Sequence, residues 1–173
     1  MTTASDRIVS IVSSYVGCSL EHDTDRLAEL VARGVDHPGS IVRVKTNCGT
    51  FALGVLHAAG VPHELLEHKY RNEMAIAWII QVANDCGAIR YPKRDGQPPA
   101  GALLHYWVRQ GTKTVNHHVE FCLETPTATW IARHAGGGRP KNAITDGVSD
   151  IRWNASRPLQ AWYDPDELMN GRD

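Results

Sequence analysis

The chain has 173 residues, which is the length of one domain and is enough to bury about two-thirds of the surface of the unfolded chain. Eighteen Lys and Arg against nineteen Asp and Glu give a net charge of −1, with no long run of either sign, which excludes a dominant basic surface for nucleic acid or anionic lipid. A hydrophobic fraction of 42% and a charged fraction of 21% are typical of globular domains and exclude both a disordered chain and a coiled coil.

Helical periodicity dominates the first half of the chain. Apolar residues recur at i, i+3, i+4, i+7 and i+8 from Ile8 to Val16, which predicts an amphipathic helix. A second helix is predicted between Thr24, a candidate N-cap, and Gly34. Two further helices are predicted from about Asn47 to Ala59, before Gly60, and from about Asn72 to Asp85, before Gly87.

After Arg90 the pattern changes to short segments rich in aromatic and β-branched residues, separated by Pro and Gly. Strands are predicted over residues 102–108, 117–124, 127–134 and 151–153. In the second of these, Val119 and Phe121 lie on one face and His118 and Glu120 on the other, because strand side chains alternate. Helices followed by an antiparallel sheet predict an α+β domain.

The four cysteines form neither a zinc motif nor a disulfide framework. They are separated by 30, 38 and 36 residues, far more than paired zinc ligands. His63 and His68 lie at i and i+5, about 140° apart on a helix at ~100° per residue, so they cannot converge on one ion. We therefore expect no metal and no cofactor.

Cys48 has the most suggestive position of the four cysteines. It follows a polar extended stretch and begins a long apolar helix, so its sulfur lies at the first helical turn. Free backbone N–H groups there favour the thiolate, which is the form that attacks a carbonyl. The competing interpretation is a small buried cysteine, which is common in protein cores.

A nucleophilic cysteine needs a base, and His118 at the start of an apolar strand is a suitable one. His117 is its rival. Adjacent strand residues point to opposite faces, so one histidine of the pair faces Cys48 and the other does not.

Three segments, residues 46–52, 98–107 and 118–123, occur in an order that resembles that of the NlpC-type and CHAP (cysteine, histidine-dependent amidohydrolase/peptidase) enzymes. Residues 46–52, Thr-Asn-Cys-Gly-Thr-Phe-Ala, are similar to the segment that opens the nucleophile helix of that family. Residues 98–107 and 118–123 are similar to its Pro-Gly-Asp-Leu and His-Val strands, although Ala102 stands where the family has Asp. The match covers roughly residues 40–138.

The resemblance implies a papain-like fold, with N-terminal helices and the nucleophile helix packed on a small antiparallel sheet. It implies that Cys48 attacks an amide of a peptidoglycan peptide, that His118 transfers the proton, and that a thioester is then hydrolysed. The backbone N–H of Cys48 would be one oxyanion donor. The family orients its histidine with a polar residue on the next strand, where His134 lies, and Glu120 and Asn142 remain alternatives.

We expect one domain over residues 1–173, with the family-like core at about 40–138 and a C-terminal extension at 139–173. Trp153 and Trp162 in this extension are candidates for a substrate groove, or else they close the core.

The expected function is hydrolysis of cell-wall peptides by a phage or prophage lysis or tail enzyme. Three alternatives stay open. A secreted antibacterial amidase effector would have an immunity protein as its partner, an acyltransferase would use the same dyad, and a non-catalytic relative would keep the fold alone.

The polar N-terminal residues and the interrupted apolar stretches predict neither a secretory signal nor a membrane span. We therefore expect a monomer that is made in the cytoplasm, does not insert into membranes, and reaches the cell wall through a holin, a phage tail or a secretion system.

Overall fold

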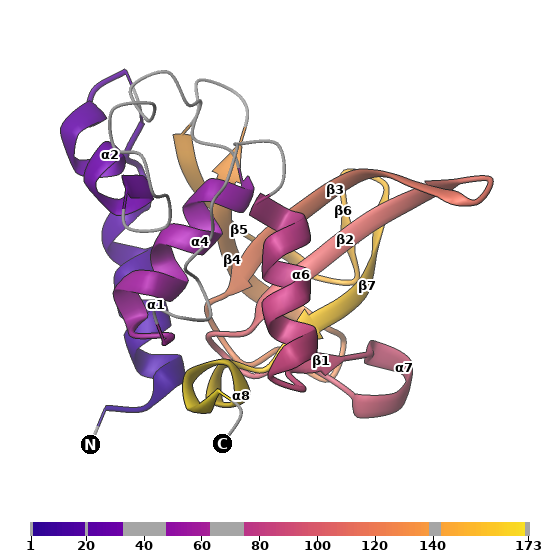
Figure 1. Ribbon diagram of the computed structural model, residues 1–173. Helices are drawn as coiled ribbons and strands as arrows, with labels where there is room; N and C mark the ends of the chain where they lie inside the picture. The colour runs from indigo at the N-terminus through magenta and orange to yellow at the C-terminus, as the bar shows by residue number, and fades with distance from the viewer. Residues whose placement is uncertain (1, 20, 33–47, 63–74, 139–142, 172–173) are drawn as a thin grey trace.

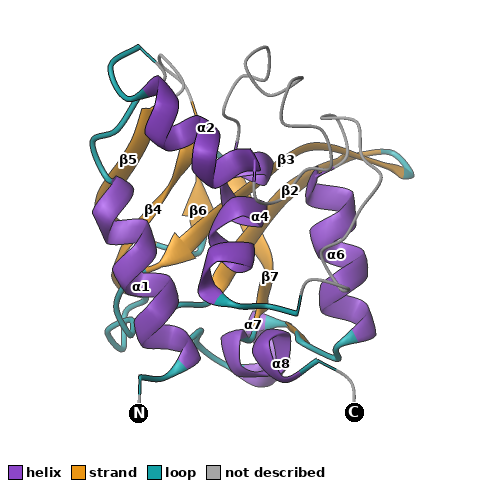
Figure 2. Cartoon of the chain, turned by 60° about the vertical axis from the view of Figure 1, so that its left-hand side comes forward, coloured by secondary structure: helices purple, strands orange, loops and turns teal. Residues whose placement is uncertain are grey.

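Helices cover one face of an antiparallel sheet in the computed structural model, which describes residues 2–19, 21–32, 48–62, 75–138 and 143–171 (Figure 1). The helices α1, α2, α4 and α6 lie in front of the strands in Figure 2. All the strand pairs of the described residues are antiparallel. The α+β class predicted from the sequence is therefore confirmed.

The described helices are α1 (Ala4–Tyr15), α2 (Thr24–Ala32), α4 (Cys48–Ala59), α6 (Ala75–Asp85), α7 (Pro92–Asp95) and α8 (Pro165–Asn170). The first four lie where apolar periodicity predicted helices. Thr24 is the first residue of α2 rather than the residue before it. Thr3 caps α1 through its hydroxyl, which accepts from the backbone N–H of Asp6, and the Asp6 carboxylate accepts from the N–H of Thr3.

The described strands are β1 (Ile89–Arg90), β2 (Leu103–Gln110), β3 (Lys113–Cys122), β4 (Ile131–Gly138), β5 (Ala143–Asp150), β6 (Trp153–Asn154) and β7 (Arg157–Tyr163). Their order across the sheet is β1-β7-β2-β3-β4-β5, and β6 pairs with β7. The strand predicted at 127–134 begins later, at Ile131, because residues 127–130 form a turn in which Trp130 has a φ of 66°.

The C-terminal residues contribute to the middle of the sheet as well as to its edge. β5 forms the edge beside β4, and β7 lies between β1 and β2. The sequence pattern missed both strands, since β5 is mostly polar and includes Gly147, and β7 includes Pro158.

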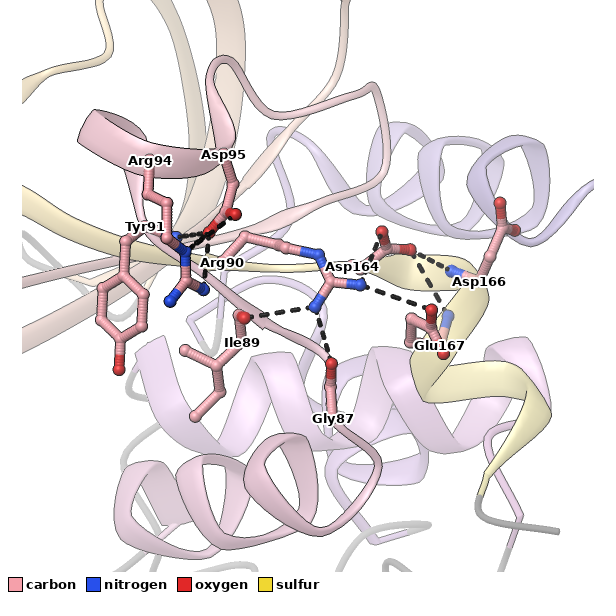
Figure 3. Close-up of polar contacts among 9 residues, drawn as sticks. All are labelled: Gly87, Ile89, Arg90, Tyr91, Arg94, Asp95, Asp164, Asp166 and Glu167. Carbon is pink, nitrogen blue, oxygen red and sulfur yellow. Dashed lines mark hydrogen bonds and ion pairs between the residues drawn. The ribbon is translucent and has the colours of Figure 1, made fainter.

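A partly buried arginine joins the last helix to the strand β1 (Figure 3). The Arg90 guanidinium donates to the carbonyl of Gly87 and forms ion pairs with Glu167 at 3.3 Å and with Asp164 at 3.8 Å. Asp164 also caps α8 by accepting from the backbone N–H groups of Asp166 and Glu167. These contacts hold the end of the chain against β1.

Each face of the sheet has its own apolar cluster. The helix-covered face buries Val119, Phe121 and Ala135 against α4, and Phe51 meets Phe121 edge-to-face with ring centroids 6.4 Å apart. The opposite face, called the outer face below, buries a smaller cluster that includes Leu104 and Tyr106. Because α4 packs against both β3 and β4, its N-terminus is fixed relative to the sheet.

β3 and β4 separate soon after they pair. Their ladder consists of Phe121 with Ala135 and Cys122 with His134. Alternate residues of a strand direct their backbone N–H and C=O groups to the same neighbouring strand, so Val119 of β3 and Gly137 of β4 direct theirs toward each other. These two residues lie beyond the ladder and are not paired. The N-terminus of α4 reaches the sheet at this separation, and that position creates the candidate site.

Candidate active site

Cys48 is the first residue of α4 and is partly buried. Burial opposes ionisation of its thiol. A hydrogen bond with His118, the charge of that histidine, and the backbone N–H groups of Val119 and Gly49 outweigh burial, so the pKa of the Cys48 thiol is lowered. The Val119 N–H is available because β3 has already separated from β4 at this residue. The site therefore favours a thiolate.

His118 lies on β3 with its side chain 16% exposed. Burial alone would lower its pKa, but the hydrogen bonds and negative charges of Cys48 and Glu120 raise the pKa of His118 to about 9. The opposite shifts of Cys48 and His118 favour a thiolate–imidazolium pair near neutral pH.

Glu120 orients His118. The Nε2 atom of His118 lies 2.9 Å from the Oε1 atom of Glu120, two residues along the same strand and on the same face. A carboxylate accepts hydrogen bonds and does not donate them, so Nε2 carries the proton and Nδ1 is left for Cys48. Burial opposes ionisation of Glu120, but His118 and His134 outweigh it and lower the pKa of Glu120 to about 2.

The series of polar contacts from Cys48 through His118 to Glu120 continues across the sheet to β4 and β5. His134 Nδ1 donates to the second carboxylate oxygen of Glu120, and its Nε2 lies 2.8 Å from the Oγ atom of Ser149. Both ring nitrogens of His134 are therefore engaged with groups other than His118. The structure brings His118 into contact with both Cys48 and Glu120 and places His134 behind the carboxylate.

A pocket of about 630 Å³ opens onto these residues. This volume lies within the ~300–1,000 Å³ that is usual for small-molecule sites. Its described lining comprises Cys48, His118, Glu120, Gly136, Gly137, Gly138, Thr145, Asn154, Ala155 and Arg157. The glycines come from the end of β4, and the last three residues come from the β6–β7 hairpin, so distant parts of the sequence build one site.

Gly136 lets β4 approach the orienting carboxylate. A Cβ atom at this position would lie 2.9 Å from Cγ of Glu120 and 3.1 Å from the carbonyl oxygen of Val119. Real Cβ atoms do not approach a backbone oxygen and a side-chain carbon so closely without displacing them. The glycine run, residues 136–138, is therefore a wall of the pocket.

His117 lies on the other face of β3. Its Nδ1 lies 2.9 Å from Nε2 of the buried His105, whose Nδ1 lies 2.6 Å from the hydroxyl of Tyr163. Burial, with the charges of His117 and His118, lowers the pKa of His105 to about 3. The two adjacent histidines thus have different surroundings, as strand alternation predicts.

The two predicted groove tryptophans lie outside the described lining of the pocket. Trp162 is 5% exposed, packs in the outer-face cluster and donates from Nε1 to the carbonyl of Gly96, so it is a core residue. Trp153 is 58% exposed on β6, beside the pocket residue Asn154. Asn142 and the segment with His63 and His68 lie outside the described residues.

The other three cysteines are buried and lie outside the described lining of the pocket. Burial raises the pKa of the Cys122 thiol to about 11, and its sulfur donates to the carbonyl of Glu124. Within the described ranges, no group of three or more His, Cys, Asp or Glu side chains could hold a metal ion. No helix in those ranges is long and apolar enough to cross a bilayer.

Sequence reasoning proposed Cys48 and His118 and ranked Glu120 below His134. The spacing of two residues between His118 and Glu120 was the signal in favour of Glu120, because it places both on one face of one strand. Arg157 was missed, since nothing local in the sequence connects the β6–β7 hairpin with Cys48.

Comparison of the chain with protein-family models, with curated proteins and with solved structures finds no match in any of the three.

Proposed function

We propose that this protein is a cysteine-dependent amide hydrolase with a papain-like arrangement, and that its substrates are peptides of the bacterial cell wall. The observation that carries the proposal is the contact series Cys48–His118–Glu120 on the wall of a pocket, with pKa shifts that favour a thiolate beside an imidazolium. The substrate class comes from the resemblance of the Cys, Pro-Gly and His-Val segments to NlpC-type and CHAP enzymes.

In the first half of the reaction, the Cys48 thiolate attacks the carbonyl carbon of the amide. The tetrahedral intermediate places negative charge on the carbonyl oxygen, and the backbone N–H of Cys48 at the first turn of α4 would stabilise it. His118 then gives its proton to the leaving amine, and a thioester to Cys48 remains.

In the second half, neutral His118 takes a proton from water as the water attacks the thioester. The C–S bond breaks, the carboxylic acid product leaves, and the proton returns to the His118–Cys48 pair. Glu120 does not transfer a proton in this scheme. It holds Nε2 protonated and stabilises the imidazolium charge.

The proposal is tested by incubating the purified protein with peptidoglycan and analysing the released fragments by mass spectrometry. The wild type should release fragments with one new amine and one new carboxylate at a defined bond. Cys48→Ala should release none and should keep the circular dichroism of the wild type, because a partly buried pocket residue contributes little packing.

Three control variants replace Cys18, Cys86 and Cys122 with Ala in turn. None of these thiols lines the pocket, so each variant should keep the cleavage pattern of the wild type. Cleavage by Cys48→Ala, or cleavage lost equally in all four variants, would exclude Cys48 as the nucleophile.

A further inference from the structure

The proposed reaction needs a second hydrogen-bond donor for the negative charge that develops on the carbonyl oxygen. The backbone N–H of Cys48 supplies one donor, and an oxyanion hole adds a further backbone or side-chain donor. Apart from the thiol, two residues of the described lining have side chains with uncharged donors, Asn154 and Thr145. A suitable donor has to line the pocket, hold a fixed orientation and have no other acceptor.

Strand register brings Asn154 to the face of the sheet that carries His118. Tyr106 of β2 pairs with His118 on one side and with Leu159 of β7 on the other, and its side chain packs with that of Leu159 in the outer-face cluster. Arg157 lies two residues before Leu159 and therefore on the same face, and Asn154 is its directly opposed partner on β6. Asn154 consequently lines the pocket together with His118.

Arg157 fixes the orientation of the Asn154 amide. The Nη1 atom of Arg157 lies 3.2 Å from the Oδ1 atom of Asn154. A guanidinium has donors only, so the amide atom that it contacts is the oxygen. This orientation depends on that contact alone and is independent of any further partner of Arg157. Within the described ranges, the Nδ2 group of Asn154 donates no hydrogen bond, so both of its N–H donors are left for a ligand.

The turn that carries Asn154 holds its position. Ala155 and Ser156, the two residues between Asn154 and Arg157, have φ angles of 44° and 68°. A two-residue turn with both central residues in the left-handed region is the tight hairpin turn, and non-glycine residues adopt it at a cost in strain. Thr145, by contrast, is exposed on β5 and its hydroxyl can rotate. Asn154 is therefore the better preorganised donor, which is the property that stabilises an oxyanion.

We infer that Asn154 is the second oxyanion donor, and that its Nδ2 group donates to the carbonyl oxygen of the substrate while the Cys48 thiolate attacks the carbon. This inference rests on the proposed function and names a catalytic residue of the same site. Negative charge develops on that oxygen only as the tetrahedral intermediate forms. The hydrogen bond therefore accelerates acylation and does not accelerate a reaction of the thiolate that forms no oxyanion.

The test compares two reactions of Cys48 that differ in whether an oxyanion forms. With p-nitrophenyl acetate, the thiolate attacks the acetyl carbon and the carbonyl oxygen takes the negative charge. The C–O bond then breaks, p-nitrophenolate leaves with the electron pair, and a thioester remains. With iodoacetamide, the C–S bond forms at the methylene carbon and iodide leaves with the electron pair of the C–I bond.

The acylation rate is measured from the absorbance of p-nitrophenolate in the first turnover, and the alkylation rate by mass spectrometry of the intact protein. Both are corrected by the rates of Cys48→Ala. In Asn154→Ala, acylation should slow by roughly a hundred- to a thousand-fold, the loss that follows removal of one oxyanion donor. Alkylation should stay within about two-fold of the wild-type rate, because the contact of the thiol with His118 is unchanged.

Asn154→Asp is the second variant. It keeps the oxygen that Arg157 contacts and replaces only the donor group, so the ratio of acylation to alkylation should fall at least as far as in Asn154→Ala. The matched control is Asn84→Ala, since Asn84 is exposed on α6 and lies outside the described lining, and it should keep both rates.

A fall in acylation of less than about ten-fold in Asn154→Ala, or an equal fall in acylation and alkylation, overturns the inference. So does a loss of acylation in Thr145→Val beside an unaffected Asn154→Ala, or a wild type that is alkylated and not acylated. If Asn154→Ala does not fold, Asn154→Asp decides. A folded wild type in which neither reagent modifies Cys48 contradicts the proposed function itself, and the inference falls with it.

Discussion

At the scale of single residues, the site depends on how two hydrogen bonds divide the nitrogens of one imidazole. Glu120 accepts from Nε2 of His118, which leaves Nδ1 for Cys48. The next residue toward the N-terminus, His117, is bonded to His105 on the helix-covered face. The two adjacent histidines therefore have different partners, because successive side chains of a strand point to opposite faces of the sheet.

Replacement of the two histidines separates these roles. His118→Ala should lower kcat by about four to six orders of magnitude, as the loss of a nucleophile's base does in a hydrolase. His117→Ala should have a mild effect, because its ring contacts His105 rather than the thiol. Both variants are compared by cleavage of peptidoglycan fragments, and the opposite ranking would place the nucleophile against the other face of β3.

Glu120→Gln tests the third residue through the pH dependence of the rate. The negative charge of Glu120 raises the pKa of His118, so its removal should lower that pKa from about 9 and move the alkaline fall in kcat/KM to lower pH. We also expect kcat to fall by about a hundred-fold or more, since the carboxylate stabilises the imidazolium.

His134→Ala is the companion variant. It leaves the hydrogen bond between His118 and Glu120 in place, so it should reduce kcat less than Glu120→Gln does. It should also shift the alkaline fall in kcat/KM by less. A larger effect of His134→Ala than of Glu120→Gln, measured from pH 5 to pH 10, would return the orienting role to His134.

At the scale of elements, the separation of β3 from β4 is the decisive feature. A continuous ladder would pair Val119 with Gly137 and would close the space into which Cys48 projects. Instead the backbone N–H of Val119 donates to the sulfur. The N-terminal turn of α4 and the edge of β3 together surround the thiolate with donors, although neither element would do so alone.

Gly136→Ala tests the close approach of β4 to the site. The new Cβ would lie 2.9 Å from Cγ of Glu120, so either the carboxylate or the strand must move. We expect a loss of stability of about 1–3 kcal/mol, as for other overpacked sites. The activity should fall as well, because Glu120 orients His118.

The matched control for stability is Gly138→Ala. A Cβ at Gly138 meets no atom within 4 Å, and the residue is in the same strand. Its midpoint of thermal unfolding should not decrease. Equal losses of stability in the two variants would mean that flexibility of the glycine run, rather than space beside Glu120, requires glycine at 136.

At the scale of the whole molecule, the sheet places the C-terminal strand β7 beside β1 and β2, which come much earlier in the chain. β7 lies between β1 and β2, and α8 is fastened to β1 by Arg90. The C-terminal residues also supply Asn154, Ala155 and Arg157 to the pocket. Residues outside the predicted family-like core at about 40–138 therefore supply part of the site.

Truncation tests this dependence. A chain that ends at Gly138 lacks β5 and β7 and exposes the edge of β2 and the buried side chains of its two faces. We expect it to lack a cooperative thermal transition and to be inactive. A chain that ends at Gly171 is the control and should unfold as the full chain does. A folded, active 1–138 fragment would contradict the contribution of β7 to the domain.

Local sequence patterns were sufficient to predict several of the helices and the facing of strand side chains. Apolar spacing located α1, α4 and α6, and alternation placed His118 and Glu120 on one face of β3. The position of Cys48 at the start of an apolar helix was also local information, since a helix N-terminus is recognised from a few residues.

Which residues of the site contact one another depends on the tertiary structure. It placed Glu120 between His118 and His134, buried Trp162 in the core, and brought Arg157 to the pocket. These contacts depend on the register and order of strands that are distant in sequence, and β5 and β7 carry too little apolar pattern to reveal that order. A polar side chain gains its partners from neighbouring strands, so its role is set by packing rather than by its own segment.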